Sequence, residues 1–457
     1  MFRKETEFQE TEIGDFPKDW EVRRLNEIAE LQRGLSYSGR EKSKDEIPEG
    51  YLFLTLNSIK EGGGLKDDGW TWVKSDKLRE RHFVKEGDLV IANTEQSKDG
   101  SLIGSPAIVH FPEWYTKDKA VFSHHISKLL LRISNVDVSF LFYYLSFVQP
   151  LARKYHTGTG VWGLNVDSWA RDLLIPLPPL DEQKRIAGVL SMIDGGIESV
   201  DRAIAKLERM KRVLLNELLT GRIRVREENG KLTCYKETEF QDTEIGEIPK
   251  DWKLVKLSNI VEDIYYGITA KAVEHKTGLK ILRTTDIKDY NVDWDSLPFC
   301  EITEKRGNIQ RFLLKKGDII IARAGTTGVC VLVEKDFEDV IFGSYLIKIR
   351  LSKNVYPRFI YYFCQSHSYW NQITSGQAGS TIKNINIPLL KSLNVPLPSS
   401  VKEQTAITEI LSTVDKAIEL YRREKERLLS LKRGLMSVLL TGRVRVMSDV
   451  RDVEVNV

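Results

Sequence analysis

Two long stretches of the chain carry apolar residues at alternating spacings of three and four. The first stretch has Ile186, Leu190, Ile193, Ile197, Val200, Ile204, Leu207, Leu214 and Leu218, and the second has Ile407, Leu411, Val414, Ile418, Tyr421, Leu428, Leu435 and Leu439. This pattern is typical of a helix that packs one apolar stripe against a partner helix. Because such a helix is unstable in water alone, the two stretches are predicted to pack against each other, and the short returns after them favour an antiparallel coiled coil.

The ends and interruptions of these stretches refine the prediction. Gly221 and Gly442 follow the last apolar positions, where a left-handed glycine ends a helix. Lys211, Lys425 and Lys432 interrupt the stripes and are predicted to weaken the core and to help fix the helix register. A helix of about 40 residues spans about 60 Å at 1.5 Å per residue.

The remaining sequence alternates short β-rich runs with apolar helical segments, which predicts mixed α/β units. The expected strands are Tyr51–Leu56, Asp88–Ala92, Lys128–Ile133, Lys280–Arg283, Asp318–Ala322 and Leu346–Leu351. The expected helices are Ser139–Ser146 and Pro357–Ser366. Their aromatic runs, Phe140–Leu145 and Phe359–Phe363, are predicted to pack in the core rather than to stack on bases. Loops rich in Gly, Ser and Thr are expected at 157–160 and 375–380.

The chain contains an internal repeat. Residues 4–20 read KETEFQETEIGDFPKDW, and residues 236–252 read KETEFQDTEIGEIPKDW. Pro176–Pro179 is echoed by Pro396–Ser399, and Leu218–Arg222 by Leu439–Arg443, both of which read LLTGR. The order is therefore unit, helix, unit, helix, which predicts an internal pseudo-twofold arrangement. The predicted boundaries are 1–175 and 227–395 for the two units, 176–226 and 396–446 for the helical regions, and 447–457 for a tail.

Composition narrows the function only a little. A net charge of +3 in 457 residues is small for a nucleic-acid-binding protein, although a basic stripe can lie within a balanced total. Cys234, Cys300, Cys330 and Cys364 form no CxxC pair, which disfavours a zinc site and a disulfide framework. The N-terminus has no apolar signal segment and no stretch is long enough to span a membrane, so a cytoplasmic protein is expected.

The duplicated order resembles the specificity (S) subunits of type I restriction–modification enzymes. The resemblance is carried by Pro176–Pro178 and Pro396–Pro398, by the Glu-Gln pairs at 182–183 and 403–404, and by the two LLTGR closures. It extends from the Ile-Gly-x-x-Pro-x-x-Trp segment, Ile13–Trp20, to Arg443. Each motif alone is loose, but the duplicated order is specific.

The resemblance implies an α+β fold in which two mixed α/β target-recognition domains are separated by two antiparallel coiled-coil helices. It implies that each domain reads one half of a bipartite, asymmetric site in double-stranded DNA, and that the helices set the spacing. It further implies docking of two methyltransferase (M) subunits and of restriction (R) subunits. No cofactor is expected in this chain, because S-adenosylmethionine, ATP and Mg²⁺ would be bound by the partner subunits.

Candidate DNA contacts are polar and aromatic residues in the expected loops of the two units. Arg, Lys, Asn and Gln pair with base edges, and hydroxyl groups contact phosphates. Arg33–Tyr37 and Tyr266–Lys271 are matching segments that resemble a turn approaching DNA in the family. The candidates are Arg33, Ser36, Tyr37, Asn93, Thr94, Gln96, Lys98, Thr157, Thr159 and Trp162 in the first unit, and Tyr266, Thr269, Lys271, Arg323, Thr326, Thr327, Gln377, Ser380, Thr381 and Lys383 in the second.

Two other groups are weighed against structural explanations. The arginines after the helices, Arg222, Arg224, Arg443 and Arg445, could contact phosphates, but the helix dipole already explains cations there. His124 and His125 are expected on a strand, where neighbouring side chains point to opposite faces and make a poor metal or catalytic site. A structural role, or a DNA contact by one of them, is favoured instead.

Signals of catalysis are mostly absent from the sequence. It has no Walker A motif and no Asn-Pro-Pro-aromatic segment of the kind found in adenine methyltransferases. No catalytic or metal-binding residue is therefore predicted. Two alternatives stay open, a self-contained type II-like restriction or methylation enzyme and a coiled-coil adaptor whose units bind protein.

Overall fold

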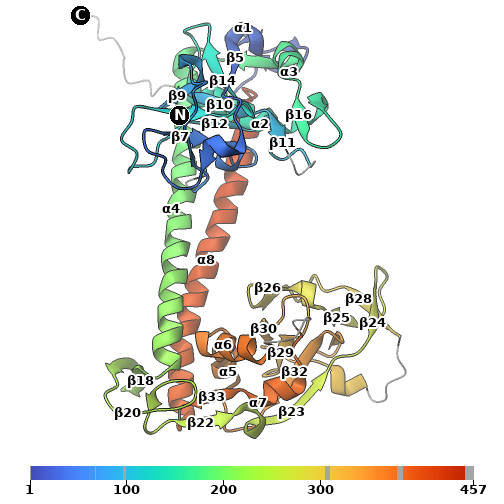
Figure 1. The fold of residues 1–457 in the computed structure, drawn as a ribbon. Coiled ribbons are helices and arrows are strands. Elements are labelled where there is room, and N and C mark those ends of the chain that lie inside the picture. The colour runs from blue at the N-terminus through green and yellow to red at the C-terminus, as the bar shows by residue number, and fades with distance from the viewer. Residues whose placement is uncertain (1, 67, 96–98, 304–308, 378–383, 448–457) are drawn as a thin grey trace, which may run out of the picture. The chain divides into compact units, whose positions relative to one another are not determined.

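The computed structural model describes residues 2–447 except 67, 96–98, 304–308 and 378–383, and the chain forms two compact units (Figure 1). Unit 1 comprises Met1–Val200 and Glu424–Val457, and unit 2 comprises Asp201–Arg423. Two long helices, α4 (Leu180–Leu219) and α8 (Val401–Leu439), each contribute a segment to both units. The prediction of mixed α/β units joined by two long helices is confirmed.

Two larger sheets form the body of unit 1. The first has the strand order β12-β10-β14-β5, and the second has the order β6-β8-β7-β13-β9, in which β7 and β13 are parallel. The strands are β5 (Ala29–Arg33), β6 (Lys42–Ser43), β7 (Tyr51–Leu54), β8 (Thr71–Val73), β9 (Phe83–Lys85), β10 (Leu89–Ala92), β12 (Pro106–Ile108), β13 (Lys119–Phe122) and β14 (Ile126–Leu131).

Alternation along β10 shows how the layers of unit 1 pack. Leu89 and Ile91 belong to a core shared with the helices, whereas Val90 and Ala92 belong to a core shared with the second sheet. Successive side chains of a strand point to opposite faces, so the first sheet lies between the helices and the second sheet. The helices are α1 (Leu25–Ile28), α2 (Val138–Val148) and α3 (Val166–Asp172), together with segments of α4 and α8.

Unit 2 repeats this plan. Its sheets have the orders β23-β32-β29-β30 and β24-β28-β25-β31, with β25 and β31 parallel. Ile319 and Ile321 of β29 face the helical core, and Ile320 and Ala322 face the second sheet. The elements are β23 (Val261–Tyr266), β24 (Ala270–Val273), β25 (Lys280–Leu282), β28 (Phe299–Ile302), β29 (Ile319–Ala322), β30 (Cys330–Leu332), β31 (Val340–Phe342), β32 (Leu346–Leu351), α5 (Pro357–Phe363), α6 (His367–Gly376) and α7 (Ile387–Ser392).

Smaller strands complete each unit. In unit 1 they are β1 (Phe2–Lys4), β2 (Phe8–Thr11), β3 (Gly14–Pro17), β4 (Glu21–Arg24), β11 (Thr94–Glu95), β15 (His156–Thr157), β16 (Trp162–Leu164), β17 (Leu174–Leu177) and β34 (Val444–Val446). In unit 2 they are β18 (Ile223–Glu228), β19 (Lys231–Lys236), β20 (Phe240–Gln241), β21 (Ile248–Pro249), β22 (Lys253–Lys256), β26 (Ile287–Lys288), β27 (Asn291–Val292) and β33 (Asn394–Leu397).

Short 3₁₀ helices connect many of these strands. They are η1 (Gly39–Glu41), η2 (Leu56–Ser58), η3 (Glu80–His82), η4 (Gln149–Tyr155), η5 (Leu257–Asn259), η6 (Thr284–Asp286) and η7 (Ile309–Phe312). The predicted strands and helices are present with ends shifted by a few residues. The expected loop at 375–380 is wrong in part, because Ser375 and Gly376 form the end of α6; its residues from 378 lie outside the described part.

In each unit a segment of α4 packs against a segment of α8. Ile186 and Leu190 share the core of unit 1 with Met436 and Leu439, and Leu218 shares the core of unit 2 with Ile407 and Leu411. Early residues of one helix meet late residues of the other, so the segments are antiparallel within each unit. Gly221 and Gly442 have φ of 71° and 68°, which confirms them as the glycines that end the helices.

Two of the lysines that interrupt the apolar stripes, Lys211 and Lys432, form ion pairs with the facing helix. In unit 2, Lys211 Nζ lies 2.7 Å from Asp415 Oδ1, and the Tyr362 hydroxyl of α5 donates to Asp415 Oδ2 at 2.8 Å. In unit 1, Lys432 Nζ lies 2.6 Å from Asp194 Oδ1, and the Tyr143 hydroxyl donates to Asp194 at 2.8 Å. Burial and the neighbouring carboxylate raise the pKa of both tyrosines, so both remain donors at neutral pH. Each Lys–Asp–Tyr triad ties both long helices to the helix that packs on the sheet.

Replacing Asp415 with Leu is expected to lower the free energy of unfolding by about 2 kcal/mol, because Lys211 loses its counter-charge and the Tyr362 hydroxyl loses its acceptor. Adding Lys211→Met to this variant is expected to restore much of the loss, because no unpaired charge then remains. Urea denaturation of the two single variants and the double variant measures this coupling. Additive losses would mean that the triad does not act as a unit.

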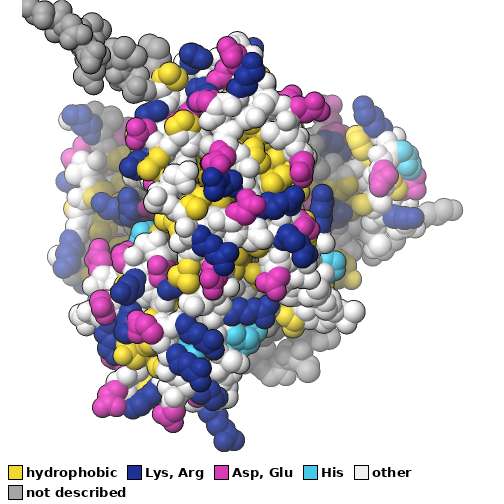
Figure 2. Space-filling view, turned by 90° about the horizontal axis from the view of Figure 1, so that it is seen from above, with side chains coloured by type: hydrophobic (Ala, Val, Ile, Leu, Met, Phe, Trp, Pro, Cys, Tyr) yellow, Lys and Arg dark blue, Asp and Glu magenta, His cyan; other side chains and the backbone are white. Residues whose placement is uncertain are grey.

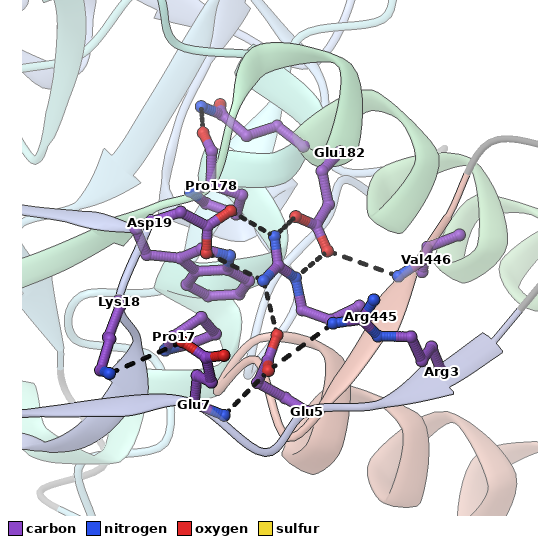
Figure 3. A network of polar contacts seen from close by, with 12 residues as sticks. Arg3, Glu5, Glu7, Pro17, Lys18, Asp19, Pro178, Glu182, Arg445 and Val446 are labelled. Carbon is purple, nitrogen blue, oxygen red and sulfur yellow. Dashed lines mark hydrogen bonds and ion pairs between the residues drawn. The ribbon is translucent and has the colours of Figure 1, made fainter.

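The repeated sequence segments build one buried ion network in each unit. In unit 1, the Arg445 guanidinium donates to Glu182 Oε1 and Oε2 at 2.7 and 2.6 Å, to Asp19 at 2.9 and 2.7 Å, and to Glu5 at 2.8 Å (Figure 3). Glu5 also accepts from the backbone amides of Thr6 and Glu7. These bonds join the N-terminal segment, the start of α4 and the strand after α8.

Unit 2 contains the same network with the same bonding pattern. Arg224 donates to both oxygens of Glu403, to both oxygens of Asp251, and to Glu237. The Lys-Glu-Thr-Glu and Lys-Asp-Trp segments are therefore alike in both repeats because they supply these carboxylates. The two arginines lie in the strands after the helices and are buried among carboxylates, so neither helix-dipole compensation nor phosphate contact explains them.

The strands that carry these arginines differ in one respect. In unit 2, β18 and β19 form a hairpin in which Arg224 is opposite Tyr235. In unit 1 the equivalent pair is β34 with β1, in which Arg445 is opposite Arg3. β1 and β34 come from opposite ends of the described chain and pair without a connecting turn. In unit 1 they therefore form the structure that the β18–β19 hairpin forms in unit 2.

Candidate nucleic-acid interface

In unit 1 the ends of several strands converge at one edge. Leu35 N donates to Phe122 O at 2.8 Å, and His124 N donates to Leu35 O at 2.9 Å. Asn93 N donates to His125 O at 2.7 Å, and Leu164 N donates to Asn93 O at 2.7 Å. The segment after β5, the segment after β10, the turn between β13 and β14, and β16 therefore form one hydrogen-bonded framework.

Unit 2 has the same framework at the equivalent edge. Ile268 N donates to Phe342 O at 3.0 Å, Arg323 N to Tyr345 O at 2.9 Å, and Ile385 N to Arg323 O at 3.0 Å. Arg323 thus takes the position of Asn93, and Tyr345 takes that of His125. The backbone is shared between the units, whereas the side chains that it presents are different.

In each unit a glycine is required where the segment after β5 or β23 crosses the turn between β13 and β14 or between β31 and β32. A Cβ on Gly34 would lie 2.2 Å from the carbonyl oxygen of Phe122, and a Cβ on Gly267 would lie 2.2 Å from that of Gly343. Both are backbone atoms, so no side-chain movement relieves the contact. The glycines of Arg33–Tyr37 and Tyr266–Lys271 therefore allow these segments to pack on the turns.

Several unit 1 candidates lie in this framework. Tyr37 packs at the edge of the His124 ring, with centroids 5.8 Å apart, and Thr94 Oγ1 lies 2.9 Å from His125 Nδ1. Trp162 stacks on His156 at 4.2 Å. Arg33 and Ser36 are exposed beside them, and the exposed Thr157 donates to Gly163 O from the neighbouring strand, near the exposed Thr159.

Asn93 is placed differently from the other unit 1 candidates. It is 2% exposed, and its side-chain nitrogen donates to Ser127 Oγ at 2.9 Å. Its backbone holds the framework together, and its side chain lies inside the unit. Gln96 and Lys98 lie outside the described residues, but the loop that follows them is anchored, because buried Glu95 accepts from the amides of Gly100, Leu102 and Ile103.

In unit 2, Arg323 and Tyr266 come together. The Arg323 guanidinium lies 4.7 Å from the centre of the Tyr266 ring, and the Tyr266 hydroxyl accepts from Ile387 N. Thr326 is exposed and Thr327 is half-buried in the loop after Arg323. Thr269 and Lys271 are exposed and lie just before and within β24, the edge strand of the second sheet. Gln377 follows α6, and Ser380, Thr381 and Lys383 lie outside the described residues.

The expected strand position of His124 and His125 is wrong. They lie in the turn between β13 and β14 rather than on a strand, and their rings are 3.9 Å apart. Burial is the main cause that lowers the pKa of His125, so its imidazole is neutral at pH 7 and suited to hydrogen bonding. The sequence analysis also missed Tyr345. An alignment of Phe122–Ile126 with Phe342–Leu346 would have identified both turns.

On the face drawn in Figure 2, charge alone does not mark an interface. Figure 2 shows Lys and Arg side chains interspersed with Asp and Glu on one face of the molecule, without a large field of one sign. Within the residues that the structure describes, no group of three His, Cys, Asp or Glu side chains could hold a metal ion. No helix in the same residues is long and apolar enough to cross a membrane.

The aromatic runs lie where the sequence predicted. Phe140, Leu141 and Leu145 are fully buried in unit 1, and Phe359, Tyr362 and Phe363 are buried in unit 2. Core packing is therefore confirmed for them, and the framework at the strand ends is the better candidate for DNA contact.

Comparison with known proteins supports the same reading. The chain matches the family described as type I restriction modification DNA specificity domain over residues 17–209 and 249–430. It is 28% identical to the type I restriction enzyme MjaVIII specificity subunit of Methanocaldococcus jannaschii, covering 98% of each chain. It is 26% identical to the EcoKI specificity subunit of Escherichia coli, covering 86% of this chain and 82% of that one.

Two solved structures share the fold. The S subunit of a type I restriction–modification system from M. genitalium gives a TM-score of 0.55 at 15% identity, covering 92% of this chain and 96% of that chain. A chain from a study of complex assembly and conformational transition in the type I system gives 0.53 at 17% identity, covering 94% and 99%. With the family match in both repeats, these findings show that the chain belongs to the type I restriction modification DNA specificity family.

Proposed function

We propose that this chain is the non-catalytic DNA-specificity subunit of a type I restriction–modification complex. Each unit reads one half of a bipartite, asymmetric site through the framework at its strand ends. The observation that carries this proposal is that one backbone framework occurs twice with different side chains, such as Thr94 and His125 in unit 1 and Arg323 and Tyr345 in unit 2. Two units with the same backbone framework and different side chains suit two half-sites of different base sequence.

The long helices are proposed to set the spacing between the half-sites. Helices α4 and α8 have 40 and 39 residues, and a helix of that length extends about 60 Å. One turn of DNA is about 34 Å, so such a helix suits readers that are one to two turns apart. The Lys–Asp–Tyr triads support this role, because each fixes the helix register inside its unit.

The same helices are proposed to dock the methyltransferase subunits, with restriction subunits joining the complex. Apolar side chains on their outer faces support this assignment, since exposed apolar residues mark interaction surfaces. These residues are Met192 and Leu431 in unit 1, and Val213 and Leu420 in unit 2, with exposed fractions between 49% and 73%. S-adenosylmethionine, ATP and Mg²⁺ are assigned to the partners, and the target adenine would be flipped out of the duplex by the methyltransferase.

Exchange of the DNA-reading segment of unit 2 tests the proposal. Residues 257–393 are replaced by the equivalent segment of a relative, which leaves the Arg224 network, β22 and β33 intact. The chain and its methyltransferase subunit are expressed together, and methylated adenines are mapped by sequencing. The expected result is a split motif in which the exchange alters one half and leaves the other half and the spacing unchanged.

Other outcomes of this exchange would contradict particular parts of the proposal. Active methylation without a split motif would favour a protein-binding adaptor. Loss of all methylation by a folded exchange variant would place partner binding in the exchanged segment rather than on the helices. Cleavage or methylation of DNA by the purified chain alone would indicate a self-contained enzyme.

A further inference from the structure

The turns between β13 and β14 and between β31 and β32 hold one residue each in equivalent positions, His125 and Tyr345. The carbonyl oxygen of each residue accepts from the strand-end residue beside it, Asn93 N at 2.7 Å and Arg323 N at 2.9 Å. On the other side, each turn pairs through a parallel bridge with the glycine segment, Leu35 with Ser123 and Ile268 with Gly343. The turn backbone is therefore held from both sides.

Tyr345 is exposed in spite of this rigid backbone. Its side chain is 64% exposed, and packing in the fold does not account for an aromatic residue at this position. A tyrosine ring offers a large apolar face and a hydroxyl that both donates and accepts, with few rotamers to lose on binding. Its backbone partner Arg323 stacks on Tyr266, so three residues suited to nucleic-acid contact lie at one edge.

His125 is oriented by its neighbours. Its Nδ1 lies 2.9 Å from Thr94 Oγ1, and its ring lies against that of His124, with the centroids 3.9 Å apart and the planes tilted by 38°. The Tyr37 ring in turn packs at the edge of the His124 ring. When the Thr94 hydroxyl bonds to Nδ1, the second ring nitrogen remains for a hydrogen bond to another group.

We propose that His125 and Tyr345 are specificity-determining residues, each of which contacts base edges in the half-site read by its own unit. This inference rests on the function proposed above and assigns the reading to two named side chains. The two residues occupy one place in the shared framework but differ in size, reach and hydrogen-bonding groups. They would therefore select different base pairs at equivalent positions of the two half-sites.

The test uses His125→Ala and Tyr345→Ala in the full chain, each expressed with its methyltransferase subunit. Methylated sites are mapped for the wild type and both variants. Tyr345→Ala is expected to reduce discrimination at one base pair about tenfold in one half-site only, and His125→Ala is expected to do so in the other half. The matched controls are Trp114→Ala in unit 1 and Tyr235→Ala in unit 2, because both remove exposed aromatic rings away from the turns.

For variants whose complexes methylate no DNA, the affinity for DNA is measured instead. The purified complexes are titrated with duplexes in which each base pair of the half-site is substituted, and the affinity ratio is compared with that of the wild type. Unchanged ratios at every position would overturn the assignment of these residues, as would an unchanged motif in the mapping. If the wild-type complex shows no split motif, the proposed function itself fails, which is a separate result.

Discussion

Replacing Arg445 with Met is expected to lower the free energy of unfolding of unit 1 by about 3–5 kcal/mol. The variant keeps most of the side-chain volume and removes the guanidinium from Glu182 and Glu5, which are 3% and 4% exposed at their side chains, so that Glu5 keeps only the exposed Arg3 at 3.9 Å as a counter-charge. Two buried carboxylates that lose their guanidinium and keep only backbone amides as donors cost far more than the loss of a surface ion pair. The N-terminal segment would also lose its link to the start of α4.

Urea denaturation measures this loss, and hydrogen exchange locates it. Backbone amides of β1 and β34 are expected to exchange faster, because these strands pair with each other around Arg445. Arg443→Met is the matched control, since Arg443 is exposed two residues earlier in the same segment. Equal stability of the Arg445→Met and Arg443→Met variants would show that the network contributes nothing to folding.

The contribution of Glu5 in this network to the free energy of unfolding decreases at low pH. The backbone amides of Glu7 and Thr6 and the Arg445 guanidinium lower the pKa of Glu5 from 4.5 to about 2. A carboxyl group with a lowered pKa in the folded state stabilises it fully above the unfolded value. This contribution is therefore lost as the pH falls from about 4.5 to about 2. The Arg445→Met variant should keep part of this dependence, because the backbone amides are the larger cause.

The long helices and the repeat could be predicted from the sequence because both depend on local, periodic patterns. Spacings of three and four identified α4 and α8, and Gly221 and Gly442 identified their ends. Lys211 and Lys432 were recognised as interruptions of the stripes, but their partners Asp415 and Asp194 were not. Those pairs depend on the register between two helices far apart in the sequence, which a pattern along one helix does not contain.

The functions of single side chains were harder to predict. Arg224 and Arg445 follow helix ends, where a cation is ordinary, yet their partners come from three distant segments and bury them. His124 and His125 follow a strand-like run and were expected on opposite faces, but a turn places their rings together. An asparagine amide is suited to hydrogen bonding with a base edge, but the Asn93 side chain is buried and donates a hydrogen bond to Ser127 inside the unit. In each case tertiary contacts decide the outcome.

Replacing Gly34 with Ala is expected to alter the half-site read by unit 1 and to lower the free energy of unfolding by about 1–3 kcal/mol. The new Cβ would lie 2.2 Å from Phe122 O and 2.7 Å from Phe122 C, so the backbone must move. That movement separates the segment after β5 from the turn that carries His124 and His125, because Leu35 and Phe122 are hydrogen-bonded there. Both side chains would then be displaced.

Gly39→Ala is the matched control for this change. Gly39 lies five residues further along, nothing lies within 4 Å of its Cβ position, and its φ is outside the left-handed region. Methylated-site mapping is expected to show a normal motif for Gly39→Ala and a weakened preference in one half for Gly34→Ala. The half read by unit 2 should be unchanged in both variants, because its turn is held by Gly267. A normal motif with Gly34→Ala would mean that the turn does not take part in reading, since steric displacement of its backbone would then have left recognition intact.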